Sequence, residues 1–241
     1  MKRSGFLSST ISLAVFASLI SSASAVVVTY TLVPDLSMLT LSGDISGLAF
    51  QAQKSGSMVD FFTGTITGNL VGGVLTFSEG SVITGGANPA GPFVPATNGF
   101  TVENYGFSIP SIAATAAFRN LVIDMEGGTA QDGVASRAVV FFKGGVMDYD
   151  TPPTSSGGFG VGQIPYLNAG GRNSSVGLVS ITTFEGIETL SIPVVFSATI
   201  STPSVISTFT GTLVATRAVP EPASIAFSLA GLGLALVRRR K

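Results

Sequence analysis

Residues 58–77 read MVDFFTGTITGNLVGGVLTF, and this stretch decides the fold class. A threonine occupies every second position from 63 to 67, and glycine or isoleucine fills the positions between. This period of two places alternate side chains on opposite faces, as in a β-strand. A Val-Gly-Gly turn at 71–73 then leads into an apolar run at 74–77, as in the return of a hairpin. The stretch predicts two antiparallel strands.

The residues on either side have the same character. Glycine and β-branched residues are frequent and only 10% of the chain is charged, a composition that suits strands and tight turns. Between residues 111 and 124, the residues favour a strand that starts near Ala116. A short helix before this strand remains an alternative. Turn signals recur about every dozen residues, so we predict an all-β chain with one antiparallel β-sandwich or jelly-roll-like domain over 26–217. Further strands are predicted at 26–33, 100–109, 116–125, 134–143, 176–184, 188–200 and 205–216.

Two proline-rich stretches, 85–98 and 144–175, are predicted to be long loops at one end of the sandwich. A weak internal echo also exists: FFTGTI at 61–66 resembles TFTGTL at 208–213. Two strands that pair in one sheet would produce such an echo without duplication, so we do not infer a repeat.

The N-terminus predicts a secretory signal peptide over 1–25. Lys2 and Arg3 precede a mostly apolar stretch at 6–20, and Ala23-Ser24-Ala25 follows as an A-x-A pattern. Small residues at Ala23 and Ala25 fit a signal peptidase, which would cleave after Ala25. The alternative, a retained membrane helix, is disfavoured because the apolar stretch is short for a span of about 20 residues.

The C-terminal stretch 218–241 has three parts in a fixed order. Pro220, Glu221 and Pro222 form an extended junction, because proline continues neither a helix nor a sheet ladder. An uncharged apolar segment, Ile225 to Val237, would enter a bilayer as a helix. A helix from Ala223 to Val237 would be only roughly 22 Å long, which is shorter than the hydrocarbon core of about 30 Å. The final part is a basic cluster that would stay on the cytoplasmic face, formed by Arg238, Arg239, Arg240 and Lys241.

This combination, together with a signal peptide, resembles the bacterial PEP-CTERM sorting signal. The resemblance implies recognition by an exosortase, a membrane cysteine transpeptidase, with processing near the triplet. It also implies delivery of the body to the cell surface or extracellular matrix after a transient stay in the inner membrane. A plain tail anchor with an incidental Pro-Glu-Pro triplet remains the alternative.

Composition excludes several classes of function. The chain has no cysteine and no histidine, which rules out disulfides, thiolate catalysis and Ser-His-Asp triads. Outside the two terminal segments, six basic residues face twelve acidic ones, a balance of about −6 that disfavours nucleic acid as a partner. We therefore expect a body that is not an enzyme and that holds no cofactor and no metal.

Carboxylates are the remaining candidates for chemistry. Asp124 and Glu126 share one face of a predicted strand and could serve glycoside hydrolysis, although acids beside a Gly-Gly pair more often end a strand in solvent. Asp148 and Asp150, with Asp132 elsewhere, raise the possibility of calcium, although solvated acids in a loop are the commoner case.

Two tyrosines in the second predicted loop, Tyr149 and Tyr166, could stack on sugar rings. Three functions for the body follow. The favoured one is a structural or adhesive surface component, with extracellular polysaccharide as a potential partner. The alternative is a carbohydrate-binding or carboxylate-based glycan-active domain at the same location on the cell surface. A third is self-assembly through exposed strand edges.

Overall fold

The structure is a computed structural model in which almost every described residue lies in a β-strand or a turn between strands. No α-helix occurs in the described part, so the prediction of an all-β chain is confirmed. Within the same residues, no helix has the length and apolar character needed to cross a membrane. The described residues are 25–53, 57–85, 105–132, 134, 136–151, 160–165, 173–174, 178–201 and 204–219.

The described residues form sixteen strands and two short 3-10 turns, at Pro34–Leu36 and Pro110–Ile112. The strands are β1 Val26–Leu32, β2 Met38–Ile45, β3 Leu48–Ala49, β4 Gln51–Ala52, β5 Val59–Phe61, β6 Thr63–Val71, β7 Val74–Phe77, β8 Val82–Gly85, β9 Gly106–Ile109, β10 Ala114–Gln131, β11 Ala138–Thr151, β12 Gly160–Pro165, β13 Asn173–Ser174, β14 Ser180–Phe184, β15 Ile187–Ser201 and β16 Ser204–Ala218.

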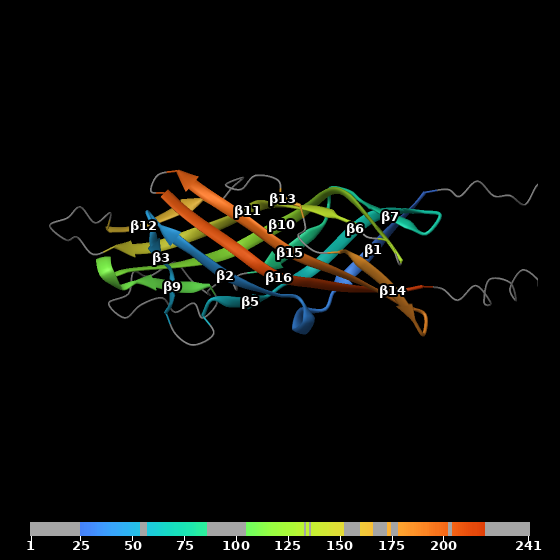
Figure 1. Cartoon of the computed structure of the whole chain (residues 1–241), viewed down its shortest axis with the longest axis horizontal. Helices are drawn as coiled ribbons and strands as arrows, with labels where there is room; N and C mark the ends of the chain where they lie inside the picture. The colour runs from blue at the N-terminus through green and yellow to red at the C-terminus, as the bar shows by residue number, and fades with distance from the viewer. Residues whose placement is uncertain are drawn as a thin grey trace, which may run out of the picture.

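All sixteen strands belong to one hydrogen-bonded sheet. Its main path runs β12-β11-β10-β7-β6-β1-β16-β15-β14, and β2, β8 and β9 attach beside this path. The two longest hairpins are β10–β11 and β15–β16, which lie along the long axis of the molecule (Figure 1). Strand β16 pairs with β1 near its end and with β2 over its first half, so it is central to the sheet.

The core lies between two halves of this sheet that face each other. Phe142 on β11 contacts Phe196 on β15 and Phe209 on β16, with ring centroids 4.7 and 5.2 Å apart. Phe118 on β10 reaches the same Phe209 at 5.8 Å. These strands are not neighbours along the main path of the sheet, so their contacts hold the two layers together. The layers face each other as in the predicted sandwich, but they belong to one continuous sheet.

The hairpin predicted from residues 58–77 is confirmed. Strand β6 buries Ile66 and Gly68, while Thr63 is exposed, as the alternation predicts. Val71 pairs with Val74, and the two residues of the turn, Gly72 and Gly73, have φ of 57° and 82°. Two successive positive φ values define the turn type that favours glycine, and its twist matches that of the flanking strands.

The prediction of a loop over 144–175 is wrong at its start. Strand β11 continues to Thr151 and so includes Asp148, Tyr149 and Asp150, and β12 and β13 lie further along. The Gly144-Gly145 pair does not end the strand. Instead, the register between β10 and β11 shifts here, because Arg119 pairs with Val146 and Val122 with Gly144. Glycine inside a strand often marks such a bulge.

Other boundaries also differ from the predictions. Strand β10 begins at Ala114, and a 3-10 turn precedes it where a short helix was the alternative. The strand expected from Val134 begins at Ala138. Strand β2 was not predicted, although its burial alternates over Met38–Ser42. Most of the predicted loop 85–98 lies outside the described residues, but Gly85 closes β8.

The molecule is elongated, and its two ends differ. Strand β1 begins and β16 ends at the same end, on the right of Figure 1, where the β6–β7 and β14–β15 turns also lie. We call this the tail end, because residues 220–241 follow β16. Strands β9 and β12 lie at the opposite end (Figure 1).

Candidate functional site

The junction between the body and the C-terminal stretch is short. Strand β16 stays paired with β15 up to its last residue, where Ala218 faces Ile187. The N–H of Val219 then donates to the carbonyl of Gly186 at 2.8 Å. Pro220 is the next residue, so the triplet begins immediately after the last hydrogen bond of the body.

An ion pair fixes this end of β16 to two neighbouring strands. Arg217 on β16 donates to Glu188 on β15 with Nη2–Oε2 and Nε–Oε1 distances of 2.7 and 3.3 Å. The hydroxyl of Tyr30 on β1 donates to the same carboxylate, and the guanidinium lies 5.2 Å from the Tyr30 ring centroid. Burial, followed by the bond to Glu188, raises the pKa of Tyr30 above its ordinary value. The body is therefore firmly held just before the tail.

The residues predicted for sorting and export lie largely outside the described part. This holds for Ala23 and for every residue from Pro220 to Lys241, including the triplet, the segment Ile225 to Val237 and the basic cluster. Ala25 is the first described residue, and it is exposed.

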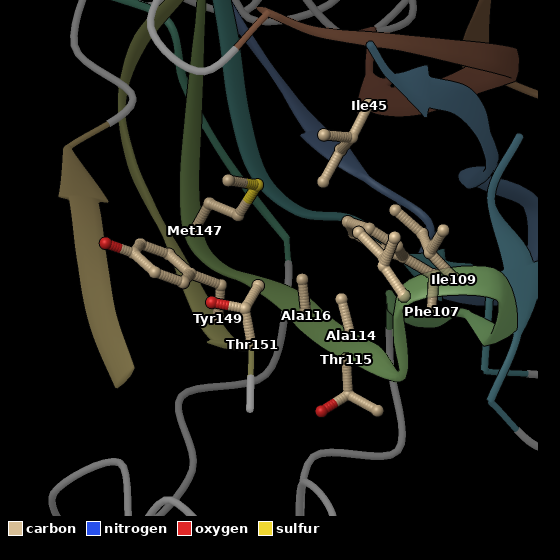
Figure 2. Close-up of a pocket in the computed structure, with 10 residues that line it drawn as sticks. Ile45, Phe107, Ile109, Ala114, Thr115, Ala116, Met147, Tyr149 and Thr151 are labelled. Carbon is tan, nitrogen blue, oxygen red and sulfur yellow. The ribbon is translucent and has the colours of Figure 1, made fainter. Parts of the chain in front are cut away.

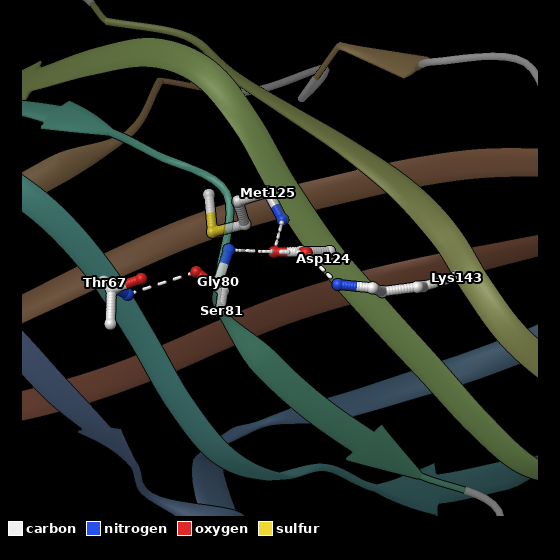
Figure 3. Close-up of polar contacts among 6 residues, drawn as sticks. All are labelled: Thr67, Gly80, Ser81, Asp124, Met125 and Lys143. Carbon is white, nitrogen blue, oxygen red and sulfur yellow. Dashed lines mark hydrogen bonds and ion pairs between the residues drawn. The ribbon is translucent and has the colours of Figure 1, made fainter.

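Asp124, the first candidate catalytic acid, is buried on β10, and its carboxylate joins three segments of chain. It accepts hydrogen bonds from the N–H of Met125 at 2.8 Å and of Gly80 at 3.2 Å, and from Lys143 Nζ at 3.0 Å (Figure 3). The bond to Asp124 raises the pKa of Lys143. This carboxylate is occupied by structural donors, and Glu126 lies two residues further on the same strand, partly buried.

Asp148, the first candidate calcium ligand, is fully buried and paired with a base. Arg119 on β10 donates to both of its oxygens, from Nε at 2.5 Å and from Nη2 at 3.2 Å. Asp150 is half-buried on the same strand. Asp132 lies in the turn at the other end of the β10–β11 hairpin, so the structure does not bring it near Asp148. Among the described residues, no three His, Cys, Asp or Glu side chains form a group that could hold a metal.

An apolar pocket opens near the end of the molecule opposite the tail end. It contains about 440 Å³ of space free of atoms, part of which is open to solvent. Met147 and Tyr149 lie on one side of it and Phe107 on the other, and the hydroxyl of Tyr149 points away from Phe107 (Figure 2). The full lining is Ile45, Phe107, Ile109, Ile112, Ala114, Thr115, Ala116, Met147, Tyr149 and Thr151.

This pocket has the chemistry to hold an apolar group and little else. No carboxylate, lysine or arginine lines it, and its surface is almost entirely carbon. A sugar site needs several hydrogen-bonding groups aimed at hydroxyls, and this lining provides only two threonines and Tyr149. Tyr149, predicted to stack on sugars from a loop, is instead a strand residue that packs against the core. Tyr166 lies outside the described residues.

Sequence reasoning missed the three ion pairs, although a signal for them was present. Charged residues are rare in this chain, yet Arg119, Lys143 and Arg217 each stand within an otherwise apolar or hydroxyl-rich strand. The acid of each pair is buried, and a buried acid needs a base beside it, since burying an unpaired charge is costly. Which acid pairs with which base depends on the register of β10 with β11 and of β15 with β16, and this register is known only from the structure.

Comparison with known protein families identifies the C-terminal stretch. Residues 218–241 match the family model of the PEP-CTERM protein-sorting motif. The comparisons with curated proteins and with solved structures gave no significant match. The matched segment begins at the last residue of β16, so it starts where the folded body ends.

Proposed function

We propose that this chain, which carries a PEP-CTERM protein-sorting motif at residues 218–241, is an exosortase substrate whose β-rich body is a non-enzymatic component of the cell surface or extracellular matrix. The sorting motif supports export through an exosortase-type pathway. The observation that carries the proposal is the direct junction between body and motif. Strand β16 reaches Ala218, and the triplet begins two residues later.

In this proposal the two terminal segments act in sequence. Signal peptidase removes residues 1–25 after Ala25, and the body folds outside the cytoplasm. The apolar segment Ile225 to Val237 stops in the inner membrane, with the basic cluster on the cytoplasmic side. Exosortase then acts near Pro220, Glu221 and Pro222 and transfers the body to its destination.

The interior of the body supports a non-enzymatic role. Asp124, Asp148 and Glu188 are each occupied by a basic partner within the sheet. A general acid or base needs a proton-accepting atom that faces substrate, and these carboxylates face Lys143, Arg119 and Arg217 instead. The sequence offers neither histidine nor cysteine as a substitute. The body is then a structural or adhesive unit.

The carbohydrate-binding alternative loses its main support. It relied on Tyr149 and Tyr166 in a predicted loop, but Tyr149 lies half-buried on β11 and Tyr166 lies outside the described residues. The pocket that Tyr149 lines is apolar rather than suited to hydroxyl groups.

Intact-mass measurement of the protein from the envelope and medium of its native cells tests the proposal. We expect the mass of a chain that begins at Val26 and ends near Pro220. A variant with alanine at Pro220, Glu221 and Pro222 should keep its tail and stay in the membrane fraction, whereas Glu185→Ala, a change of an exposed acid, should be processed normally. A wild-type mass that extends to Lys241 in every fraction would show that the tail is a plain anchor.

A further inference from the structure

Exposed apolar side chains gather at the tail end of the body. Phe184 is 74% exposed and Ile187 51% exposed, and both flank the β14–β15 turn. Val27, which is 72% exposed, lies on β1 beside the end of β6. The exposed large apolar residues of this end are Val26, Val27, Val71, Val134, Phe184 and Ile187.

The pairing of the strands places these residues together. Val26 faces Leu70 at the end of β6, and Val71 forms the adjoining turn. Val134 follows Gln131, which pairs with Val74 just beyond that turn. Ile187 faces Ala218, the last residue of β16. Several turns therefore present apolar side chains at the end of the molecule from which the tail leaves.

The same end carries little net charge. Asp132 and Glu185 are acids in these turns, and Arg137 is a nearby exposed base. Glu188 and Arg217 compensate each other inside the sheet. A surface of this kind interacts with lipid through burial of apolar groups rather than through attraction to anionic headgroups.

The length of chain between the body and the apolar segment limits how far this end can stand from a bilayer. Six peptide steps separate Val219 from Ile225, so they span at most about 22 Å. The polar layer on each side of the hydrocarbon core is itself about 5–8 Å thick. With the apolar segment in the membrane, the tail end therefore stays within about 15 Å of the headgroup layer.

We propose that the tail end rests in the headgroup layer of the bilayer while the tail is inserted, with Phe184 and Ile187 as its apolar contacts. This inference rests on the membrane insertion included in the proposed function. Lipid is the occupant because the chain beyond Val219 leads into it within a few residues. The long axis of the body then points away from the membrane, and the apolar pocket at the other end faces outward.

The absence of cysteine makes a direct test feasible. Single-cysteine variants of the full chain are produced in a host that exports it but has no exosortase, labelled with an environment-sensitive fluorophore, and reconstituted in phosphatidylcholine vesicles containing a doxyl-labelled phosphatidylcholine quencher. Phe184→Cys and Ile187→Cys report on the tail end. Ile112→Cys, an exposed residue at the opposite end, is the matched control. Leu232→Cys reports whether the apolar segment is inserted in the bilayer, independently of where the body lies.

We expect about twofold quenching at positions 184 and 187, strong quenching at 232 and none at 112, because only interfacial and inserted groups approach the doxyl lipid. Quenching at 232 without quenching at 184 and 187 would overturn this inference and leave the insertion of the tail intact. No quenching at any position would overturn both the inference and the insertion. Equal quenching at 112 and 184 would also overturn the inference, since it would mean that the body lies flat.

Discussion

At the scale of single residues, the charges of this protein stabilise the body. Arg119, Lys143 and Arg217 come from three strands, and each is the partner of a buried carboxylate. The Arg119–Asp148 pair is the most enclosed, since Asp148 is fully buried and the arginine is only 16% exposed. Removing one member of such a pair leaves the other charged and without compensation.

Asp148→Ala should therefore lower the free energy of unfolding by about 3 kcal/mol, as measured by urea denaturation. The double variant Arg119→Met, Asp148→Leu should recover much of this loss, because two apolar side chains leave no buried charge. Asp132→Ala is the control, and a change within about 0.5 kcal/mol is expected because that acid is exposed. A loss for Asp148→Ala no larger than for the control would refute a stabilising role for the pair.

Tyr105 gives the body a dependence on alkaline pH. It is fully buried, and its hydroxyl donates to the carbonyl of Leu39 at 3.0 Å. Burial, followed by the charge of Asp60, raises its pKa well above the ordinary value. The unfolded chain loses this proton near pH 10, whereas the folded chain keeps it. The contribution of Tyr105 to stability is therefore complete below about pH 10 and declines as the pH rises further.

Tyr105→Phe should cost about 1 kcal/mol at neutral pH through the lost hydrogen bond. It should also flatten the decline of stability above about pH 10, because one fewer group deprotonates on unfolding. Urea denaturation across the alkaline range, alongside wild type, measures both effects. Identical alkaline slopes for the two proteins would contradict the assignment.

At the scale of strands, two glycines explain the sequence echo noted above. Strands β6 and β16, which carry it, do not pair, because β1 lies between them. A Cβ added to Gly64 would lie 1.9 Å from the carbonyl oxygen of Val82, and one added to Gly211 would lie 2.1 Å from that of Met38. In both Thr-Gly-Thr sequences, the glycine therefore allows an adjoining strand to approach closely.

Gly211→Ala should accordingly destabilise the body by about 2–3 kcal/mol, since the clash is with backbone that cannot rotate away. Thr210→Ala on the same strand, where the side chain is exposed, is the matched control and should cost under about 1 kcal/mol. Thermal unfolding of both variants measures the difference. Equal melting temperatures would show that β2 can move to accommodate the added methyl group.

At the scale of the whole molecule, the body and the sorting motif are separate in structure but directly joined in sequence. The last backbone hydrogen bond of the described C-terminal part is that of Val219. Upstream of it, β16 contributes Leu213 and Ala215, both fully buried, and Arg217 of the ion pair with Glu188. The fold therefore needs β16 to its end and makes no described contact that requires Pro220.

A chain that stops after Val219 should be as stable as the longer chain, within about 0.5 kcal/mol. A chain that stops after Thr212 loses two buried apolar residues and the ion pair, a loss of more than about 4 kcal/mol, and should not fold. Circular dichroism and urea denaturation distinguish the two. A large loss of stability on removing residues 220–241 alone would show that the tail packs on the body.

The sequence by itself determined the all-β class, most long strands, the hairpin at 71–74 and the sorting motif. Each of these depends on local patterns, because the side-chain period and the residue preferences of turns act over a few residues. Only the tertiary structure decided which charges pair, that β11 runs through Asp148, and that apolar turns gather where the tail leaves. Those features depend on register and strand order. Register and strand order are set by the packing of residues far apart in the chain, such as Phe142 on Phe209.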